Sequence, residues 1–143
     1  MMNVNLKGVY FVAKHVIPEM LKAGGGVIVN TASISGMVGM TRQGAYAATK
    51  GAVIMLTRQM AVDYAADNIR VNAVAPGFVR TPMTEGMRAD DPDSLFDTIA
   101  ARVPMGRVAV PQDIAKAVLW LASDASAYVT GTTVTVDGGF TSQ

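Results

Sequence analysis

Three short apolar segments alternate with longer segments of helical periodicity, and this alternation constrains the fold more than any other feature of the chain. Residues Val27–Val29, Ile69–Ala75 and Thr132–Val136 each have the length and apolar content of a strand. Strands separated by helices need crossover connections, which are right-handed and produce a parallel sheet with helices on both faces. The sequence therefore predicts the α/β class, with three parallel strands in a single domain that spans residues 1–143.

Helices are predicted over Leu6–Ala23, over Ala45–Asp67 and after Pro111. In the second of these, apolar residues occur around most of the helix, and three lie off the main stripe: Ile54, Met55 and Val62. A helix of this kind is buried on more than one side, so we expect it to contact both its own sheet and a second subunit of a homo-oligomer. The segment Thr81–Arg107 has mixed charge and weak periodicity, which is typical of a mobile segment.

Composition excludes several classes of protein. Twelve basic and eleven acidic residues give a net charge of +1, which provides no field that would attract nucleic acid or an anionic membrane. No segment has the about 20 apolar residues of a membrane helix, and the absence of cysteine is compatible with the cytoplasm. Asp90, Asp91 and Asp93 lack the glycine and glutamate of an EF-hand loop, so no metal site is expected.

Tyr46 and Lys50 lie four residues apart near the start of the long predicted helix. This spacing places both side chains on one face, one turn apart. An ammonium group beside a phenol favours the phenolate, by up to about 4 kcal/mol at about 4 Å and an effective dielectric constant of about 20. The pair therefore predicts a tyrosine that exchanges a proton with a ligand near neutral pH.

A tyrosine and a lysine at this spacing are common in helices, and alone they would indicate only a surface lysine beside a half-buried ring. Ser33 changes this interpretation, because it follows the first apolar strand, thirteen positions before Tyr46. Open α/β sheets bind their ligands at the carboxyl ends of the strands. We therefore predict a site in which the Ser33 hydroxyl donates to a substrate oxygen.

Three motifs resemble those of the short-chain dehydrogenases/reductases. GVIVNTASISG contains the serine of that family as Ser33, and AYAATK contains its tyrosine and lysine as Tyr46 and Lys50. NVNLKG contains, at Asn5, the asparagine that completes the family's tetrad. IRVNAVAPGFVRTPM and YVTGTTVTVDGG are also similar, so the resemblance covers nearly the whole chain. It implies a doubly wound, Rossmann-like sheet of which this chain forms the C-terminal half.

The resemblance implies an NAD- or NADP-dependent oxidoreductase that interconverts a secondary alcohol and a ketone, of the 3-oxoacyl reductase or alcohol dehydrogenase type. It implies that Tyr46 exchanges a proton with the substrate oxygen, Ser33 stabilises that oxygen, Lys50 acts on the phenol and the ribose, and Asn5 anchors a water. The residues that it implies for cofactor binding are Tyr46, Lys50, Pro76, Gly77, Val79 and Thr81. The apolar residues expected to form a substrate lid are Met83, Met87, Leu95, Phe96 and Ile99.

The sequence departs from this family at its N-terminal side. The glycine fingerprint G-x-G-x-x-G and the residue that separates NAD from NADP are both absent, so the choice of cofactor stays open. Met1-Met2 stands three positions before Asn5, where the family has already completed the first half of its sheet. We therefore expect a truncated or internally initiated form that lacks the N-terminal dinucleotide-binding half and has impaired activity. The alternative hypothesis is a non-catalytic remnant that acts as an oligomerisation partner.

Overall fold

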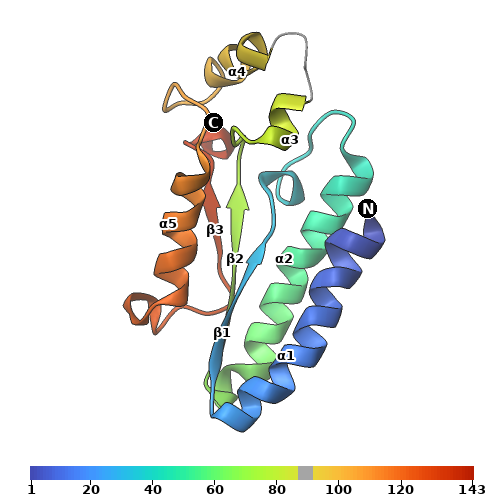
Figure 1. Ribbon diagram of the computed structural model, residues 1–143, viewed down its shortest axis with the longest axis vertical. Coiled ribbons are helices and arrows are strands. Elements are labelled where there is room, and N and C mark those ends of the chain that lie inside the picture. Colours follow the sequence, from blue (N-terminus) through green and yellow to red (C-terminus); the bar gives the residue numbers. More distant parts are fainter. Residues whose placement is uncertain (87–91) are drawn as a thin grey trace.

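A parallel three-stranded sheet forms the centre of the computed structural model, which describes residues 1–86 and 92–143. The strands β1 (Gly26–Thr31), β2 (Ile69–Pro76) and β3 (Thr133–Val136) lie side by side in this order (Figure 1). All of their pairings are parallel. The predicted α/β class, with three parallel strands and helices on both faces, is therefore confirmed.

Helices cover both faces of this sheet (Figure 1). α1 (Val9–Ala23) and α2 (Gly44–Tyr64) pack on one face, and α5 (Pro111–Ala122) packs on the other. The helix predicted from Leu6 starts earlier than expected, because a π-helical segment, η1 (Asn3–Gly8), leads directly into α1. α2 returns along the sheet against the strand direction, so it begins at the edge where the strands end (Figure 1).

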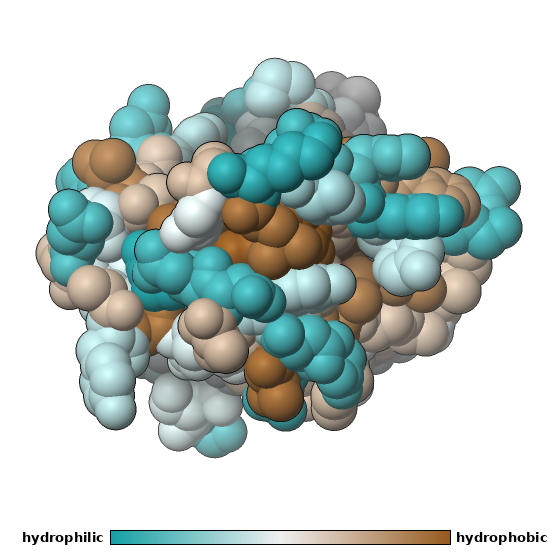
Figure 2. Space-filling view, turned by 90° about the horizontal axis from the view of Figure 1, so that it is seen from below, coloured by the Kyte–Doolittle hydropathy of each residue, from teal (hydrophilic) through white to brown (hydrophobic). Residues whose placement is uncertain are grey.

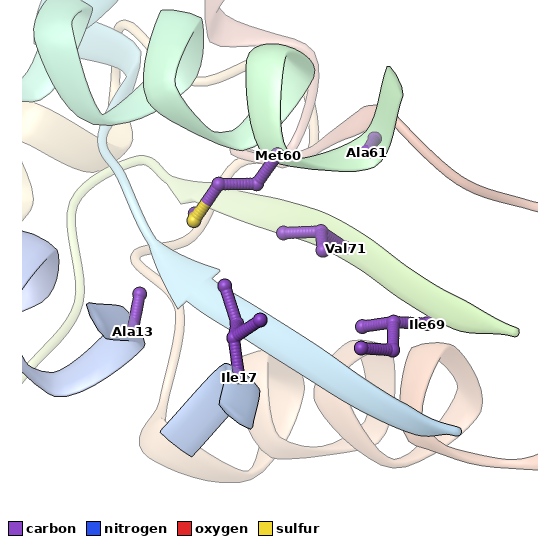
Figure 3. Packing of buried hydrophobic residues seen from close by; sticks show 6 residues of the cluster. All are labelled: Ala13, Ile17, Met60, Ala61, Ile69 and Val71. Atoms are coloured by element: carbon purple, nitrogen blue, oxygen red, sulfur yellow. The ribbon is translucent and has the colours of Figure 1, made fainter. Parts of the chain in front are cut away.

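The core lies between the sheet and the pair of helices α1 and α2. Figure 3 shows six side chains that converge there from α1, α2 and β2: Ala13, Ile17, Met60, Ala61, Ile69 and Val71. Each is at most 5% exposed, so the three elements share one dry interface. Burial of this apolar area is the main force that holds both helices against the strands.

The apolar residues of α2 that lie off its main stripe have different environments. Ile54 is only 7% exposed, because it packs in a second buried cluster with Val53 and residues of β2. A second subunit is therefore not needed to cover Ile54. Met55 and Val62 are 59% and 79% exposed, and for these two a subunit contact stays a prediction.

The segment after β2 contains two short helices, α3 (Pro82–Glu85) and α4 (Pro92–Ala100). Regular structure is therefore present in parts of Thr81–Arg107, and the mobility expected of this segment stays a prediction. Each helix begins with a proline, which suits the first helical position because the N–H of that residue needs no helical partner. Three residues that were considered for a lid or a cation loop lie outside the described residues: Met87, Asp90 and Asp91.

The surface at the end where the strands begin shows apolar side chains surrounded by hydrophilic ones (Figure 2).

Among residues 1–86 and 92–143, no helix combines the length and apolar character needed to cross a bilayer. Within the same two ranges, no three histidine, aspartate or glutamate side chains gather as a set of metal ligands.

Candidate active site

The candidate catalytic residues gather at the carboxyl edge of the sheet. Ser33 follows β1, Pro76 ends β2, and Gly77 comes directly after it. Tyr46 lies in the first turn of α2, which starts on the same side (Figure 1). This edge is where open parallel sheets bind ligands.

Ser33 is fixed by the turn that it starts. The residue is 8% exposed and extended, and it is the N-cap of the 3-10 turn η2 (Ile34–Gly36). Its Oγ accepts a hydrogen bond of 3.2 Å from the backbone N–H of Ser35. The Ser33 hydroxyl proton has no acceptor within the described part of the chain, so it is available to a ligand oxygen.

Gly36 brings this turn against the backbone of α2. A Cβ at Gly36 would lie 2.6 Å from the carbonyl carbon of Lys50 and 2.7 Å from the backbone nitrogen of Gly51. A Cβ at Gly51 would in turn lie 3.4 Å from the Gly36 carbonyl oxygen. The serine turn therefore approaches the helical turn of Lys50 more closely than any residue with a side chain would allow.

Lys50 is directed toward the end of β1. Its Nζ donates to the Thr31 carbonyl oxygen at 2.8 Å and lies 5.8 Å from the centre of the Tyr46 ring. Burial lowers the pKa of Lys50 from its ordinary value of 10.5, because desolvation disfavours the charged amine. The half-buried Tyr46 forms no hydrogen bond through its hydroxyl within residues 1–86 and 92–143.

Asn5 lies on η1 and faces α2. Its Nδ2 donates to the hydroxyl of the fully buried Thr49 at 3.4 Å. A cavity of about 590 Å³ between α1 and β1 is lined by Asn5, Thr31 and Lys50, among other residues. The π-helical start of the chain thus brings Asn5 to the cavity that Lys50 also lines.

The turn after β2 packs closely on the end of β3. The N–H of Gly77 donates to the Val136 carbonyl at 3.0 Å. A Cβ at Gly77 would lie 2.8 Å from the Cβ of Asp137, so only glycine permits this approach. Pro76, whose missing N–H cannot join the ladder, ends the strand just before it.

The backbone N–H of Val79 is not used in the pairing with the segment of Ala109. It forms a parallel bridge with Ala109, in which Ala109 N–H donates to the Phe78 carbonyl and Arg80 N–H donates to the Ala109 carbonyl, at 3.0 and 2.8 Å. The Val79 carbonyl accepts from the Thr84 hydroxyl at 2.8 Å. The Val79 N–H has no partner within the described residues, so it can donate to a ligand.

Thr81 caps α3 through reciprocal bonds with Thr84. The N–H of Thr81 donates to the Thr84 hydroxyl at 2.9 Å, and the N–H of Thr84 donates to the Thr81 hydroxyl at 3.4 Å. The Thr81 side chain is therefore used to start the helix. The threonine pair and Pro82 at the first helical position were visible in the sequence as a helix-start signal.

The sequence reasoning missed two polar residues at this edge. Ser35 is 5% exposed, and its hydroxyl donates to Oε1 of Gln43 at 2.5 Å. Gln43 is the N-cap residue of α2 and stands three positions before Tyr46. The spacing of Gln43, Tyr46 and Lys50 was the signal that could have identified it, because residues three and four apart share a helix face.

Comparison with known proteins identifies the family. The family described as enoyl-(acyl carrier protein) reductase matches residues 1–141. The 3-oxoacyl-[acyl-carrier-protein] reductase FabG of Thermotoga maritima is 48% identical over 137 residues, which are 96% of this chain and 54% of the relative. A short-chain dehydrogenase/reductase structure from Burkholderia xenovorans is 43% identical with a TM-score of 0.91, over 97% of this chain and 54% of that one. The chain belongs to the short-chain dehydrogenase/reductase family. The resemblance of its motifs is thereby confirmed.

Other short-chain dehydrogenases/reductases match over the same extent. Cis-4-hydroxycyclohexanecarboxylate dehydrogenase of Sinomonas cyclohexanicum is 48% identical over 138 residues, 96% of this chain and 54% of the relative. The structure of a gluconate 5-dehydrogenase from Burkholderia cenocepacia, in complex with NADP and tartrate, has a TM-score of 0.92 and 40% identity, over 99% of this chain and 55% of that one. The chain therefore spans about half the length of the curated relatives it matches.

Proposed function

We propose that the protein is an NAD- or NADP-dependent oxidoreductase that interconverts a secondary alcohol and a ketone. One observation carries this proposal: the contact between Gly36 and the Lys50 backbone brings the free hydroxyl proton of Ser33 to the helix that presents Tyr46 and Lys50. The family membership and the NADP named in the gluconate 5-dehydrogenase complex support it. The substrates named for the relatives, a 3-oxoacyl group and cis-4-hydroxycyclohexanecarboxylate, favour this reaction type.

The residues at the carboxyl edge fit the nicotinamide and ribose portion of such a cofactor. The unpaired N–H of Val79 suits a carboxamide oxygen, and the side chains of Tyr46 and Lys50 offer partners for ribose hydroxyls. The Thr81 hydroxyl already accepts from the Thr84 N–H at the start of α3, so Thr81 would contribute to cofactor binding by fixing the position of that helix. The full set that we propose for cofactor contact is Tyr46, Lys50, Pro76, Gly77, Val79 and Thr81. When bound, the nicotinamide supplies or accepts the hydride.

In this mechanism the chain's own residues handle the substrate oxygen and its proton. Ser33 donates a hydrogen bond to that oxygen, and Tyr46 gives it a proton during reduction or takes one during oxidation. Lys50 holds its ammonium group beside the phenol, with Nζ 5.8 Å from the centre of the Tyr46 ring. Asn5 lines the same cavity as Lys50, and a water held there would connect Lys50 with solvent.

Cofactor titration tests the proposal directly. NADPH and NADH are added to the purified protein while nucleotide fluorescence and Trp120 emission are followed. We expect saturable binding that weakens in Lys50→Ala, whereas Lys116→Ala, an exposed lysine on α5, behaves as the wild type. If neither nucleotide binds at millimolar concentration, the oxidoreductase proposal fails and the alternative of a non-catalytic oligomerisation partner is favoured.

We also propose that the protein is a homo-oligomer. Apolar side chains remain exposed on both helices of one face: Phe11, Val12, Met55 and Val62 are 50%, 64%, 59% and 79% exposed. Exposed apolar side chains of this kind are typical of a subunit interface. Light scattering tests the oligomer, and a monomer would contradict it. The single-domain organisation and the cytoplasmic location stay predictions.

A further inference from the structure

The buried hydroxyl of Thr49 links two residues of the candidate site. Thr49 comes directly before Lys50 on α2 and has no exposed surface. Its hydroxyl donates to the Tyr46 carbonyl oxygen at 2.7 Å and accepts from Asn5 Nδ2 at 3.4 Å. A hydroxyl has a single proton, and the Tyr46 carbonyl takes it, so the Thr49 oxygen can act toward Asn5 as an acceptor alone.

This bond fixes which end of the Asn5 amide faces α2. A side-chain amide can present either its NH2 group or its oxygen to a neighbour, and the hydrogen-bond partners decide between these two orientations. Because Thr49 can only accept, the nitrogen of Asn5 is directed to Thr49 and Oδ1 is directed away from it. Asn5 Oδ1 has no partner within residues 1–86 and 92–143.

The cavity between α1 and β1 is the place where the oriented amide can act. Asn5 and Lys50 both line this cavity, and no other charged side chain occurs among its lining residues in the described part of the chain. An ammonium group has three protons, and Lys50 uses one of them at the Thr31 carbonyl oxygen. A free amide oxygen in this cavity therefore provides an acceptor that favours the charged form of Lys50.

The π-helical segment η1 brings Asn5 to Thr49. It lies beside α2 (Figure 1), and Leu6 packs against the buried cluster that contains Val53 and Ile54 of that helix. The apolar contact holds the backbone at Asn5, whereas Thr49 sets the orientation of the side chain. Removal of the Thr49 hydroxyl should therefore release the amide and leave η1 in place.

We propose that Thr49 is a positioning residue, which turns the amide oxygen of Asn5 into the cavity that Lys50 lines. The proposal rests on the oxidoreductase function, because it takes Lys50 to act on the Tyr46 phenol. Without the Thr49 hydroxyl, the Asn5 amide turns freely and the cavity loses its fixed acceptor. The charged form of Lys50 then persists over a narrower range of pH.

Thr57 provides a matched control on the same helix. It is also fully buried, and its hydroxyl donates to the Val53 carbonyl at 2.8 Å and accepts from Asn30 Nδ2 at 2.9 Å. Thr57 lies seven residues after Lys50, which is about 10 Å along the helix axis, whereas Thr49 is adjacent to Lys50. Thr57→Val therefore removes the same kind of buried hydroxyl without releasing the Asn5 amide.

The pH dependence of alcohol oxidation tests the proposal. Oxidation of 2-butanol by NADP⁺ or NAD⁺ is followed by nucleotide absorbance from neutral to alkaline pH. The decline of kcat at alkaline pH, where neutral Lys50 no longer favours the phenolate, should begin about one pH unit lower in Thr49→Val, because a hydrogen bond to a charged group is lost. Thr49→Ser keeps the hydroxyl and should follow the wild type. Thr57→Val should lower the melting temperature as Thr49→Val does and keep the wild-type profile.

Two NMR measurements do not depend on activity. In the wild type, the side-chain amide protons of Asn5 should exchange with water up to about tenfold more slowly than those of Asn3, an exposed asparagine on the same π-helical segment. The titration of Lys50, followed in protein with 13C-labelled lysine, should shift to lower pH in Thr49→Val and stay unchanged in Thr57→Val.

The outcomes distinguish the two proposals. If 2-butanol is oxidised but Thr49→Val keeps the wild-type profile, or Thr57→Val shifts it equally, the role of Thr49 is refuted while the oxidoreductase function stands. If no alcohol is oxidised, the function fails and the Lys50 titration decides: equal midpoints in the wild type and Thr49→Val refute the role of Thr49, and a lower midpoint in Thr49→Val alone supports it. Equal exchange at Asn3 and Asn5 refutes the role even where Thr49→Val does not fold.

Discussion

Replacement of Gly36 by alanine tests whether close backbone contact assembles the site. The added Cβ would lie 2.6 Å from the Lys50 carbonyl carbon and 2.7 Å from the Gly51 nitrogen. Ordinary contact begins at 3.4 Å, so the two segments must separate by about 0.8 Å, which is 3.4 minus 2.6. Both opposing atoms belong to the backbone of α2, and no side-chain rotation can relieve the clash.

The separation should affect both stability and catalysis. Overpacking of this kind costs about 1 to 3 kcal/mol, which for a domain of this size lowers the thermal midpoint by about 3 to 10 °C. Displacement of the serine turn by nearly an ångström also moves Ser33 relative to Tyr46, and misplacement on this scale costs about 100-fold in rate. Gly36→Ala should therefore lose activity at temperatures where it is still folded.

Gly39 provides the matched control within the same loop. A Cβ there would have nothing within 4 Å, so Gly39→Ala should melt and react like the wild type. Thermal unfolding by circular dichroism and kcat for a ketone substrate give the two readouts. Equal midpoints for Gly36→Ala and Gly39→Ala would refute the inference that this contact holds the turn, and a low midpoint with unchanged kcat would refute its role in positioning Ser33.

Three further predictions concern single side chains. Tyr46→Phe should lower kcat about 100- to 10,000-fold, as expected for loss of a general acid/base, and leave the melting temperature unchanged because the hydroxyl has no partner within the described residues; activity close to the wild type would contradict its role. Burial lowers the pKa of Lys50, so the folded state loses this proton at a lower pH than the unfolded state, and the free energy of unfolding should rise as the pH approaches 10.5. Lys50→Met should abolish that rise in thermal melts recorded at increasing pH. The Arg107 guanidinium lowers the pKa of Asp113 to about 2, so the stability that this carboxylate contributes is present above 3.8 and lost as the pH falls toward about 2. Asp113→Asn should lose less stability than the wild type as the pH falls over that range. Thermal melts in acid that show the same loss of stability for both proteins would disprove the assignment.

The parts of the fold that sequence periodicity predicted are those stabilised by burial along a regular element. β2 contains Val71, Ala73 and Val74, all with no exposed surface, and its apolar run was readable directly. α4 is short, and its apolar residues Leu95, Phe96 and Ile99, which recur at helical spacing, were interpreted as a substrate lid instead of a helix. The sequence did not predict its tertiary contacts, in which the Arg80 guanidinium pairs with Asp93 and lies 4.7 Å from the centre of the Phe96 ring.

In the site too, positions within one regular element were predicted and contacts between elements were not. Ser33 was predicted because it follows an apolar strand, and Tyr46 and Lys50 because they are one helical turn apart. The roles of Gly36 and Ser35 were not predicted, because they depend on how η2 packs against α2. The π-helical conformation at Asn5 also has no signature that the spacing of apolar residues would reveal.

The contacts that arrange the proposed catalytic groups all lie within this chain. The turn of Ser33 rests on α2 through Gly36, Lys50 is bonded to Thr31, and Asn5 is bonded to Thr49. The groups proposed to meet the nicotinamide are also present, but no glycine fingerprint for the pyrophosphate occurs in the sequence. Orientation of the reacting atoms and affinity for the dinucleotide should therefore be separable in this protein. Ser33→Ala should therefore change kcat with little effect on the dissociation constant of NADPH, because the Ser33 hydroxyl is proposed to meet the substrate oxygen and is not among the proposed cofactor contacts.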